Sequence, residues 1–267
     1  MIEILGYFLA VIIGLILGLM GGGGSIITVP VLVYIMGLNP VTATAYSLFI
    51  VGSTSAFGTI QNLKNKLVHL KTAITFALPS LVGVYLSRKF IIPAIPERLF
   101  AIGTFEVHKG MFLMVLFAVI MLLAAKSMLQ TRKVEDQSIA KPEASGMQIA
   151  FSILQVFLIG IVVGLIGAGG GFLFIPMLIF ITKLPMKTAV ATSLFIISIN
   201  SLLGFIGDIG TTIIDWAFLL KFSLFSIIGI FMGIYLNKFI NEKQLKKGFG
   251  YFVLIMSLVI FVKEIFL

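Results

Sequence analysis

Cysteine is absent from this chain, and charged residues are scarce. Without cysteine the protein can form neither disulfides nor thiolate metal sites. Charged residues make up 11% of its 267 residues and hydrophobic residues 60%, whereas an ordinary soluble domain carries about 25% charge. The composition therefore excludes a soluble domain. It predicts a multi-pass protein of the cell membrane, with the lipid bilayer as its partner.

Motifs for nucleotide binding, metal binding and nucleophilic catalysis are also absent. There is no Gly-x4-Gly-Lys-Ser/Thr and no Gly-x-Ser-x-Gly, and the two histidines, His69 and His108, lie far apart. All ten acidic residues lie near the ends of apolar runs or in loops. Asp208 and Asp215 beside the 188–206 span can be coupling groups or plain loop charges, and we favour loop charges. We therefore expect no cofactor, no metal, no catalytic residue and no intramembrane carboxylate for a proton relay.

Apolar runs recur along the whole chain, and most of them are long enough to cross a bilayer. A helix needs about 20 apolar residues at ~1.5 Å each to span ~30 Å of hydrocarbon. The runs lack the strict alternation of a transmembrane barrel. The first run has no Lys or Arg before it, so we interpret it as a helix and not as a cleaved signal. The runs are 4–20, 26–38, 41–61, 72–87, 111–125, 149–166, 172–182, 188–206, 217–236 and 248–262, of which 26–38 and 172–182 are short.

The chain is duplicated. Residues 18–60 align with residues 164–206 without a gap, at a constant offset of 146 positions, and 19 of the 43 aligned residues are identical. The similarity continues further along, because residues 83–88 match residues 233–238 at an offset of 150. We expect an all-α integral membrane protein of two homologous repeats. Its expected parts are 1–125 as the first repeat, 126–148 as a polar cytoplasmic linker and 149–267 as the second repeat.

Each half contains a helix, a glycine-rich break, a short helix and three full spans. If the broken segment crosses the membrane once, the repeats are parallel; if it is re-entrant, they are inverted. The inverted arrangement places thirteen Lys and Arg residues on the side of the linker and five on the other, whereas the parallel arrangement divides them eight to ten. Because basic residues are enriched on the cytoplasmic side, we expect inverted repeats with both chain termini outside.

We attribute the net charge of +9 to basic residues that set the orientation of the chain in the membrane. In a soluble chain it would suggest a nucleic-acid partner, and here we expect none. Lys221 lies inside a helix and belongs to neither group. The thirteen inside are Lys64, Lys66, Lys71, Lys126, Arg132, Lys133, Lys141, Lys183, Lys187, Lys238, Lys243, Lys246 and Lys247; the five outside are Arg88, Lys89, Arg98, Lys109 and Lys263.

A glycine cluster interrupts the apolar sequence at the same place in both halves. Lipid cannot satisfy free backbone N–H and C=O groups, so such a break must be buried in protein or line a polar cavity. The helix that begins after each break presents unpaired N–H groups and the positive end of its dipole, which favour an anion. Glycines can instead serve close helix packing, but that would place them at i and i+4 and not in a row. The predicted anion-binding residues are Gly22, Gly23, Gly24 and Ser25 in the first cluster and Gly169, Gly170 and Gly171 in the second.

A polar stripe lies on the helix that follows each short segment. Its hydroxyl and amide groups recur at helical spacing in both halves, and they can donate hydrogen bonds to sulfonate or carboxylate oxygens without a compensating cation. Ser and Thr hydroxyls can also bond back to their own helix, and for any single residue both interpretations are left open. The stripe residues assigned to the substrate site are Ser47, Thr54, Asn62, Ser193, Asn200 and Ser201.

The glycine motifs resemble those of a known family. Residues 18–32 read Gly-Leu-Met-Gly-Gly-Gly-Gly-Ser-Ile-Ile-Thr-Val-Pro-Val-Leu, and residues 164–178 read Gly-Leu-Ile-Gly-Ala-Gly-Gly-Gly-Phe-Leu-Phe-Ile-Pro-Met-Leu. Ala43-Thr-Ala-Tyr-Ser-Leu48 recurs as Ala189-Val-Ala-Thr-Ser-Leu194. Together they are similar to the TauE/SafE sulfite exporter family, which includes proteins like the 4-toluene sulfonate uptake permeases. The resemblance implies a secondary transporter, and more narrowly an exporter, of small sulfur-containing anions such as sulfite, sulfoacetate or other organosulfonates.

Other functions stay open on the sequence. A transporter of another small organic anion, such as a carboxylate, would use the same hydrogen-bond donors. An intramembrane enzyme or assembly factor is disfavoured because it would need a nucleophile with a base, or a metal, within the membrane. A cation transporter is disfavoured because it would need buried carboxylates. Self-association as a homo-oligomer is also left open.

Overall fold

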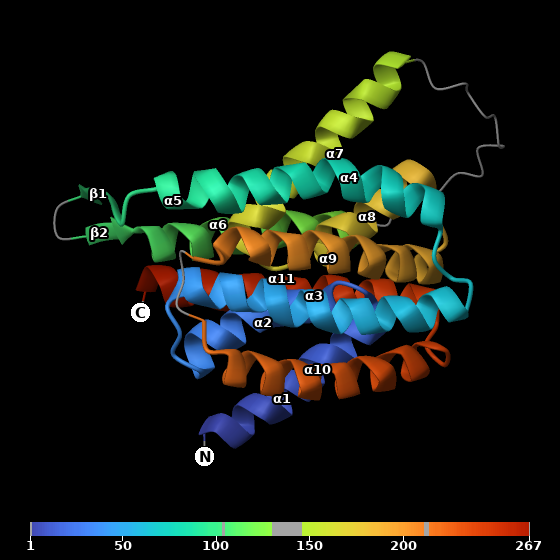
Figure 1. Ribbon diagram of the computed structural model, residues 1–267, viewed down its shortest axis with the longest axis horizontal. Coiled ribbons are helices and arrows are strands. Elements are labelled where there is room, and N and C mark those ends of the chain that lie inside the picture. The colour runs from blue at the N-terminus through green and yellow to red at the C-terminus, as the bar shows by residue number, and fades with distance from the viewer. Residues whose placement is uncertain (1, 103–104, 130–145, 211–213, 267) are drawn as a thin grey trace.

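The computed structural model describes residues 2–102, 105–129, 146–210 and 214–266, and helices dominate them (Figure 1). The first half contains α1 (Ile2–Met20), α2 (Gly23–Pro30) with the π-helical turn η1 (Val31–Ile35), α3 (Pro40–Lys64), α4 (Leu70–Leu86) with the π-helical turn η2 (Ser87–Ile91), α5 (Ile92–Ala94), the strands β1 (Arg98–Ile102) and β2 (Phe105–His108), and α6 (Lys109–Leu129). The second half contains α7 (Gly146–Ile166), α8 (Gly171–Thr182), α9 (Met186–Asp208), α10 (Trp216–Asn237) and α11 (Glu242–Phe266).

Within the residues that the structure describes, four helical segments are long and apolar enough to cross a membrane. They are Leu70–Ala94, Lys109–Lys126, Met186–Asp208 and Trp216–Asn237. Helix α3 is also long, with 25 residues, but it carries one of the polar stripes. Three shorter apolar helices, Leu5–Met20, Gly23–Ile35 and Ile153–Ile166, lie next to the glycine clusters. This is the make-up of an integral, multi-pass membrane protein.

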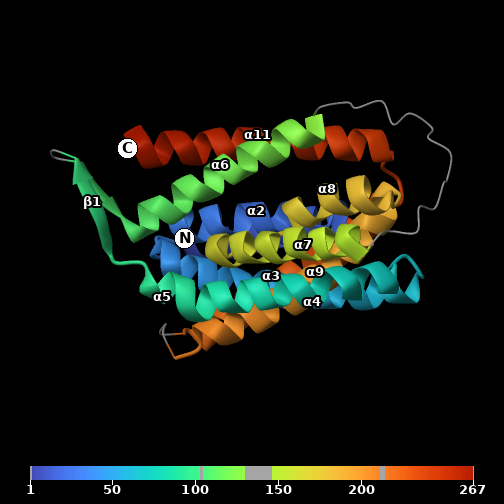
Figure 2. The ribbon, with the colours of Figure 1, turned by 90° about the horizontal axis from the view of Figure 1, so that it is seen from above.

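Both glycine clusters turn the chain back on itself. Gly21, Gly167 and Gly170 have φ angles of 65°, 71° and 74°, in the left-handed region that other residues rarely adopt. After the first turn α2 runs back along α1, so closely that a β-carbon on Gly24 would collide with the Ile13 carbonyl. In the second half α7 and α8 run in opposite directions from their turn (Figure 2), although α7 leans away from the bundle in Figure 1. Each cluster is therefore the tip of a helical hairpin.

The two halves contact each other through helix pairs, and each pair takes one helix from each half. Helix α1 packs against α10, α7 packs against α4, α3 pairs with α9, and α6 pairs with α11. β-Carbons on Gly14 and Gly18 would collide with the α10 backbone, and β-carbons on Gly160 and Gly164 with the α4 segment. These glycines have the i, i+4 spacing that lets helices approach closely in lipid. The chain thus uses glycine in both ways, in rows at the breaks and at i, i+4 between long helices.

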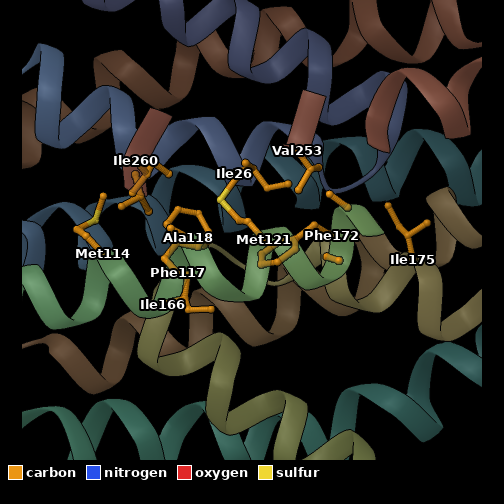
Figure 3. Close-up of a cluster of buried hydrophobic side chains, with 14 of the residues drawn as sticks. Ile26, Met114, Phe117, Ala118, Met121, Ile166, Phe172, Ile175, Val253 and Ile260 are labelled. Carbon is orange, nitrogen blue, oxygen red and sulfur yellow. The ribbon is translucent and has the colours of Figure 1, made fainter. Parts of the chain in front are cut away.

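The apolar core lies where the two short helices pack against α6 and α11. Ile26 of α2 and Phe172 of α8 lie in one buried cluster with Phe117 and Met121 of α6 and Val253 of α11 (Figure 3). The ring centroids of Phe117 and Phe172 are 6.1 Å apart. Lipid tails are as apolar as these side chains, so dispersion and close packing hold the cluster together more than exclusion of water does. The cluster anchors the two helices that begin at the glycine clusters.

The sequence predicts an outside loop over 88–109, between two apolar runs, but the structure is more ordered there. Helical backbone continues from α4 through residues 87–94, and β1 and β2 then form an antiparallel hairpin in which Phe100 lies opposite Val107. Aromatic and β-branched residues favour strands, and the segment is too short for another span. The described residues are therefore almost entirely helical, as the all-α class predicts, with a small β-hairpin at one end.

The polar linker expected over 126–148 is helical at both ends, because α6 continues to Leu129 and α7 begins at Gly146. Residues 130–145 lie outside the described residues. The division of the chain into 1–125, 126–148 and 149–267 stays a prediction.

The start of α1 and the end of α11 lie at one end of the bundle, with the β-hairpin. The ends of α3 and α6 and the starts of α4 and α7 lie toward the opposite end (Figures 1 and 2). We call this opposite end, where α3 and α6 end, the linker end. Lys64, Lys71 and Lys126 belong to helix termini at the linker end, which the excess of basic residues predicts to be cytoplasmic.

Cysteine labelling of this cysteine-free chain tests the arrangement. Lys64→Cys should react with a membrane-impermeant maleimide from the cytoplasmic side, and His108→Cys from the opposite side, because both residues are exposed and lie at opposite ends of the bundle. Lys71→Cys, also exposed, is the matched control and should label together with Lys64→Cys. Labelling of Lys64→Cys and His108→Cys from the same side would contradict the arrangement.

Candidate functional site

The starts of α2 and α8 face each other inside the bundle. Gly22 is the N-cap of α2 and Gly171 is the first residue of α8, and a β-carbon on either would collide with the backbone of the other. Residues 21–26 and 166–172 are all buried. The two glycine clusters, 146 positions apart in the sequence, therefore form one interface.

Neither helix start is capped by a side chain. Gly22 and Gly170 occupy the N-cap positions, and no side chain of the described residues caps either helix. The Ser25 hydroxyl instead donates to the Gly22 carbonyl, 2.6 Å away. The first N–H groups of a helix have no partner within the helix, and the helix dipole is positive there. Gly23 and Gly24 in α2 and Gly171 in α8 therefore supply backbone donors with an affinity for an anion.

Helix α9 lies against both clusters. The Ser193 hydroxyl contacts the Gly21 carbonyl at 3.3 Å, and it also bonds back to the Val190 carbonyl of its own helix at 2.8 Å. A β-carbon on Gly169 would lie 2.9 Å from Ser201 Oγ. The structure thus brings two of the predicted stripe residues to the two glycine clusters.

Several buried hydroxyl and amide atoms of α3 and α9 have no hydrogen-bond partner among the described residues. Asn200 donates from its amide nitrogen to Ser80 Oγ at 2.7 Å, but its own oxygen accepts nothing. Leaving such an atom unpaired costs about 1–3 kcal/mol, and native proteins contain few of them, so these atoms mark places for water or a ligand. They are Ser47 Oγ, Thr54 Oγ1, Ser55 Oγ, Thr59 Oγ1, Asn200 Oδ1 and Ser201 Oγ.

Asn62 lies apart from the other predicted site residues. It is eight residues beyond Thr54 on α3, which is about 12 Å along a helix axis. It lines a separate pocket at the linker end, together with Lys187 and Lys238. The polar stripe of the first half therefore extends from one site into another.

A buried ion pair adjoins the second glycine cluster. Arg88 is fully buried in η2, and its Nη1 lies 3.2 Å from Oδ2 of Asp208, the last residue of α9. The same nitrogen donates to Thr44 Oγ1 at 3.2 Å, while Nε and Nη2 have no partner among the described residues. A β-carbon on Gly167 would collide with Nη2. The guanidinium therefore lies directly beside the turn between α7 and α8.

This pair corrects three expectations from the sequence. Arg88 does not lie in an outside loop, Asp208 is not a loop charge, and the predicted site does not lack a cation. Hydropathy placed the ends of the spans at 87 and 206, whereas the helical backbone continues to 94 and 208, because a charge ends an apolar run whether or not the helix continues. The duplication could have indicated this position, because Arg88 aligns with Lys238 and both halves therefore carry a basic residue there. By contrast, Asp215 is exposed and caps α10 by accepting from Phe218 N–H at 3.0 Å.

A larger groove on the bundle does not suit an anion. It has a volume of about 380 Å³ and lies between α6, α7 and α8, where Leu123, Leu158 and Leu173 are among its lining residues. Every residue that lines it is apolar. Such a surface favours hydrocarbon and offers no side-chain donor to an oxyanion.

Comparisons with known proteins agree on a membrane transporter. The model of the family described as "Sulfite exporter TauE/SafE" matches residues 7–260. The chain is 28% identical to the probable membrane transporter protein YunE of Bacillus subtilis, over 95% of this chain and 94% of that protein. It is 28% identical to a probable membrane transporter protein of Xylella fastidiosa, over 92% and 90%. A probable membrane transporter protein of Methanocaldococcus jannaschii is 36% identical over 38% of this chain and 40% of its own length. No solved structure matches the chain.

Removing one member of the ion pair should destabilise the fold strongly. Asp208→Ala leaves the Arg88 guanidinium buried without its carboxylate, which we expect to lower the free energy of unfolding by about 3–5 kcal/mol. Arg88→Leu combined with Asp208→Leu should cost less than Asp208→Ala alone, because no buried charge is left. Thermal unfolding of the purified protein in detergent measures this order.

The exposed pair of Arg98 and Glu106, whose charged atoms are 3.8 Å apart, supplies the control. Arg98→Ala should leave the midpoint almost unchanged, since exposed ion pairs contribute little. A wild-type midpoint for Asp208→Ala would show that the buried pair is not a structural element.

Proposed function

The chain belongs to the TauE/SafE sulfite exporter family and is a membrane transporter, and we propose that it exports small sulfur-containing anions such as sulfite, sulfoacetate and other organosulfonates. We place it in the cell membrane, where it acts as a secondary transporter and not as an enzyme. The substrate site is the interface between α2 and α8, with α3 and α9 around it.

The contact between Gly22 and Gly171 carries this proposal. It brings two uncapped helix starts together where both are buried, and each start contributes N–H donors and a positive dipole end. The two clusters touch in this conformation, so an anion that reaches both starts must separate them. A site that opens and closes at this contact, with hydroxyls of α3 and α9 exposed as it opens, suits transport better than permanent binding.

Inverted repeats are part of the proposal. Exchanging the two halves converts the α1–α10 contact into the α7–α4 contact and leaves the α3–α9 and α6–α11 contacts unchanged, as a twofold relation requires. The two hairpins start from opposite ends of the bundle and meet at their tips (Figures 1 and 2). Each hairpin acts as a re-entrant segment, followed by three longer helices. Transporters of this architecture bind substrate where the broken helices of the two repeats meet.

The chemistry of the site favours a compact oxyanion. Backbone N–H groups and hydroxyls are donors that spread over several oxygens, and the Arg88 guanidinium adds two unpartnered donor atoms beside the second cluster. Sulfite and small sulfonates carry their charge on three oxygens. A zwitterion such as taurine also carries an ammonium, for which the described residues of this interface offer Asp208 alone, already paired with Arg88.

Binding to the purified protein tests the substrate class. Sulfite, thiosulfate and sulfoacetate should raise the thermal unfolding midpoint by mass action, whereas taurine and acetate should raise it less. Uptake of sulfite into proteoliposomes then distinguishes transport from binding. A selective response to carboxylates would replace the sulfur anions by a carboxylate substrate, and a selective response to a cation would overturn the anion site.

Single substitutions in the polar stripes should weaken binding. Ser47→Ala, Ser193→Ala and Asn200→Ala each remove a buried polar group of the proposed site, and we expect each to reduce the free energy of sulfite or sulfonate binding by about 1 kcal/mol, or roughly fivefold in affinity. Isothermal titration of the purified variants measures this effect.

Ser53→Ala is the matched control for these variants. Ser53 lies on α3 but is only partly buried, and its hydroxyl donates to the Ile50 carbonyl of its own helix at 3.1 Å. It should bind like the unmodified protein. Unchanged affinity in all three stripe variants would move the site away from α3 and α9.

A further inference from the structure

A second polar site lies at the linker end of the bundle. A pocket of about 70 Å³ is enclosed by the ends of α3 and α10 and the start of α9, and Asn62, Lys187 and Lys238 are among its lining residues. One water needs about 10–15 Å³ of such volume, so the pocket has room for an ion of a few heavy atoms. Gly18 and Val190 also line it, and Val190 contacts Gly21, so the pocket adjoins the linker side of the first glycine cluster.

The charged groups of this pocket are cations, and its amides offer both donors and acceptors. Its charged lining residues are Lys187 and Lys238, and its amides are Asn62, Asn65 and Asn237; no acidic residue lines it. Asn62 is buried. Within that part of the chain, no carboxylate lies within 4 Å of either lysine ammonium. The pocket thus gathers positive charge and hydrogen-bond donors without a counter-ion of its own.

The duplication shows what is missing from the pocket. Asn62 corresponds to Asp208 at the offset of 146, and Lys238 corresponds to Arg88 at the offset of 150. At the opposite end of the bundle, Arg88 and Asp208 form the buried pair at 3.2 Å. At the linker end a neutral amide stands where the carboxylate would be. The cation is retained and its partner is not.

We propose that this pocket binds a small oxyanion, which takes the place of the missing carboxylate between Lys238 and Asn62. The proposal rests on the transport of sulfur anions inferred above, and it makes the pocket the position at which sulfite or a small sulfonate is held on the linker side before or after it passes α2 and α8. The corresponding position at the other end takes no anion in this conformation, because Asp208 already fills it.

A phosphate of a lipid headgroup has the same chemistry as a free oxyanion. The pocket lies at the end of the helices, where headgroups surround a membrane protein, and Lys238 is exposed. The two sources are separated by measuring sulfite binding in nanodiscs of phosphatidylcholine alone and in nanodiscs that contain phosphatidylglycerol.

The decisive variant restores the carboxylate. Asn62→Asp should pair with Lys238 as Asp208 pairs with Arg88, and so should weaken the binding of sulfite and sulfate by about tenfold, while Asn62→Ala should weaken it by about threefold. Lys238→Gln should also weaken it, by about three- to tenfold. Lys126→Gln removes an exposed lysine at the same end of the bundle, outside the pocket, and should bind normally. Isothermal titration measures all four, and because Lys238 is exposed its variant should fold normally.

The outcomes separate this proposal from the transport function. If the unmodified protein transports sulfite while Asn62→Asp and Lys238→Gln keep its affinity and its rate, the pocket is not an anion site and the transport function stands. If it transports no sulfur anion but binds sulfate in a manner that Asn62→Asp abolishes, the pocket stands and the transport function falls. A third outcome is that nanodiscs with phosphatidylglycerol reduce sulfite binding by the unmodified protein but do not change it in Asn62→Asp. That result would assign the pocket to lipid phosphate and overturn its role in transport.

Discussion

Lipid offers no hydrogen bonds, so a chain that breaks its helices inside a membrane must bury the breaks in protein. This protein buries its two breaks against each other at Gly22 and Gly171. The rest of the bundle follows from that contact. Glycine pairs let α1 and α7 lie close to α10 and α4, the stripes of α3 and α9 cover the breaks, and the apolar cluster of α6 and α11 supports the two short helices from behind. The proposed site thus results from the way in which the free backbone groups at the two breaks are buried.

The ion pair of Arg88 and Asp208 adds charge to a region that otherwise relies on dipoles and hydroxyls. A buried pair contributes little net stability, because the loss of hydration offsets the attraction between the charges. Its geometry is more informative: it joins the end of α9 to η2 and places the guanidinium beside Gly167. Two donor atoms of that guanidinium are left without a partner in the described residues.

Much of this arrangement could be predicted from the sequence, because it depends on local backbone rules. Rows of glycine predicted the two breaks, and hydrophobic runs predicted the long helices. Features that depend on a distant partner escaped the prediction. The burial of Arg88 follows from its contact with Asp208, 120 positions away in the sequence, and the pocket around Asn62 depends on where α10 ends. The β-hairpin was missed for another reason, since two short strands resemble a loop when hydropathy alone is read.

Among the differences between the halves, Asp208 against Asn62 and Arg88 against Lys238 make the ends of the bundle unequal. A transporter built from two identical inverted repeats would have conformations of equal energy facing either side of the membrane, since each conformation would be the image of the other. Here one end holds an arginine and a carboxylate, which pair and close it, and the other holds a lysine and an amide, which leave a pocket. If the proposed transport uses two conformations related by the duplication, the exchange of Asp208 for Asn62 and of Arg88 for Lys238 makes them unequal in energy when no anion is bound. An anion in the pocket would act as the missing carboxylate and thereby reduce that difference, which links substrate binding to the change between conformations.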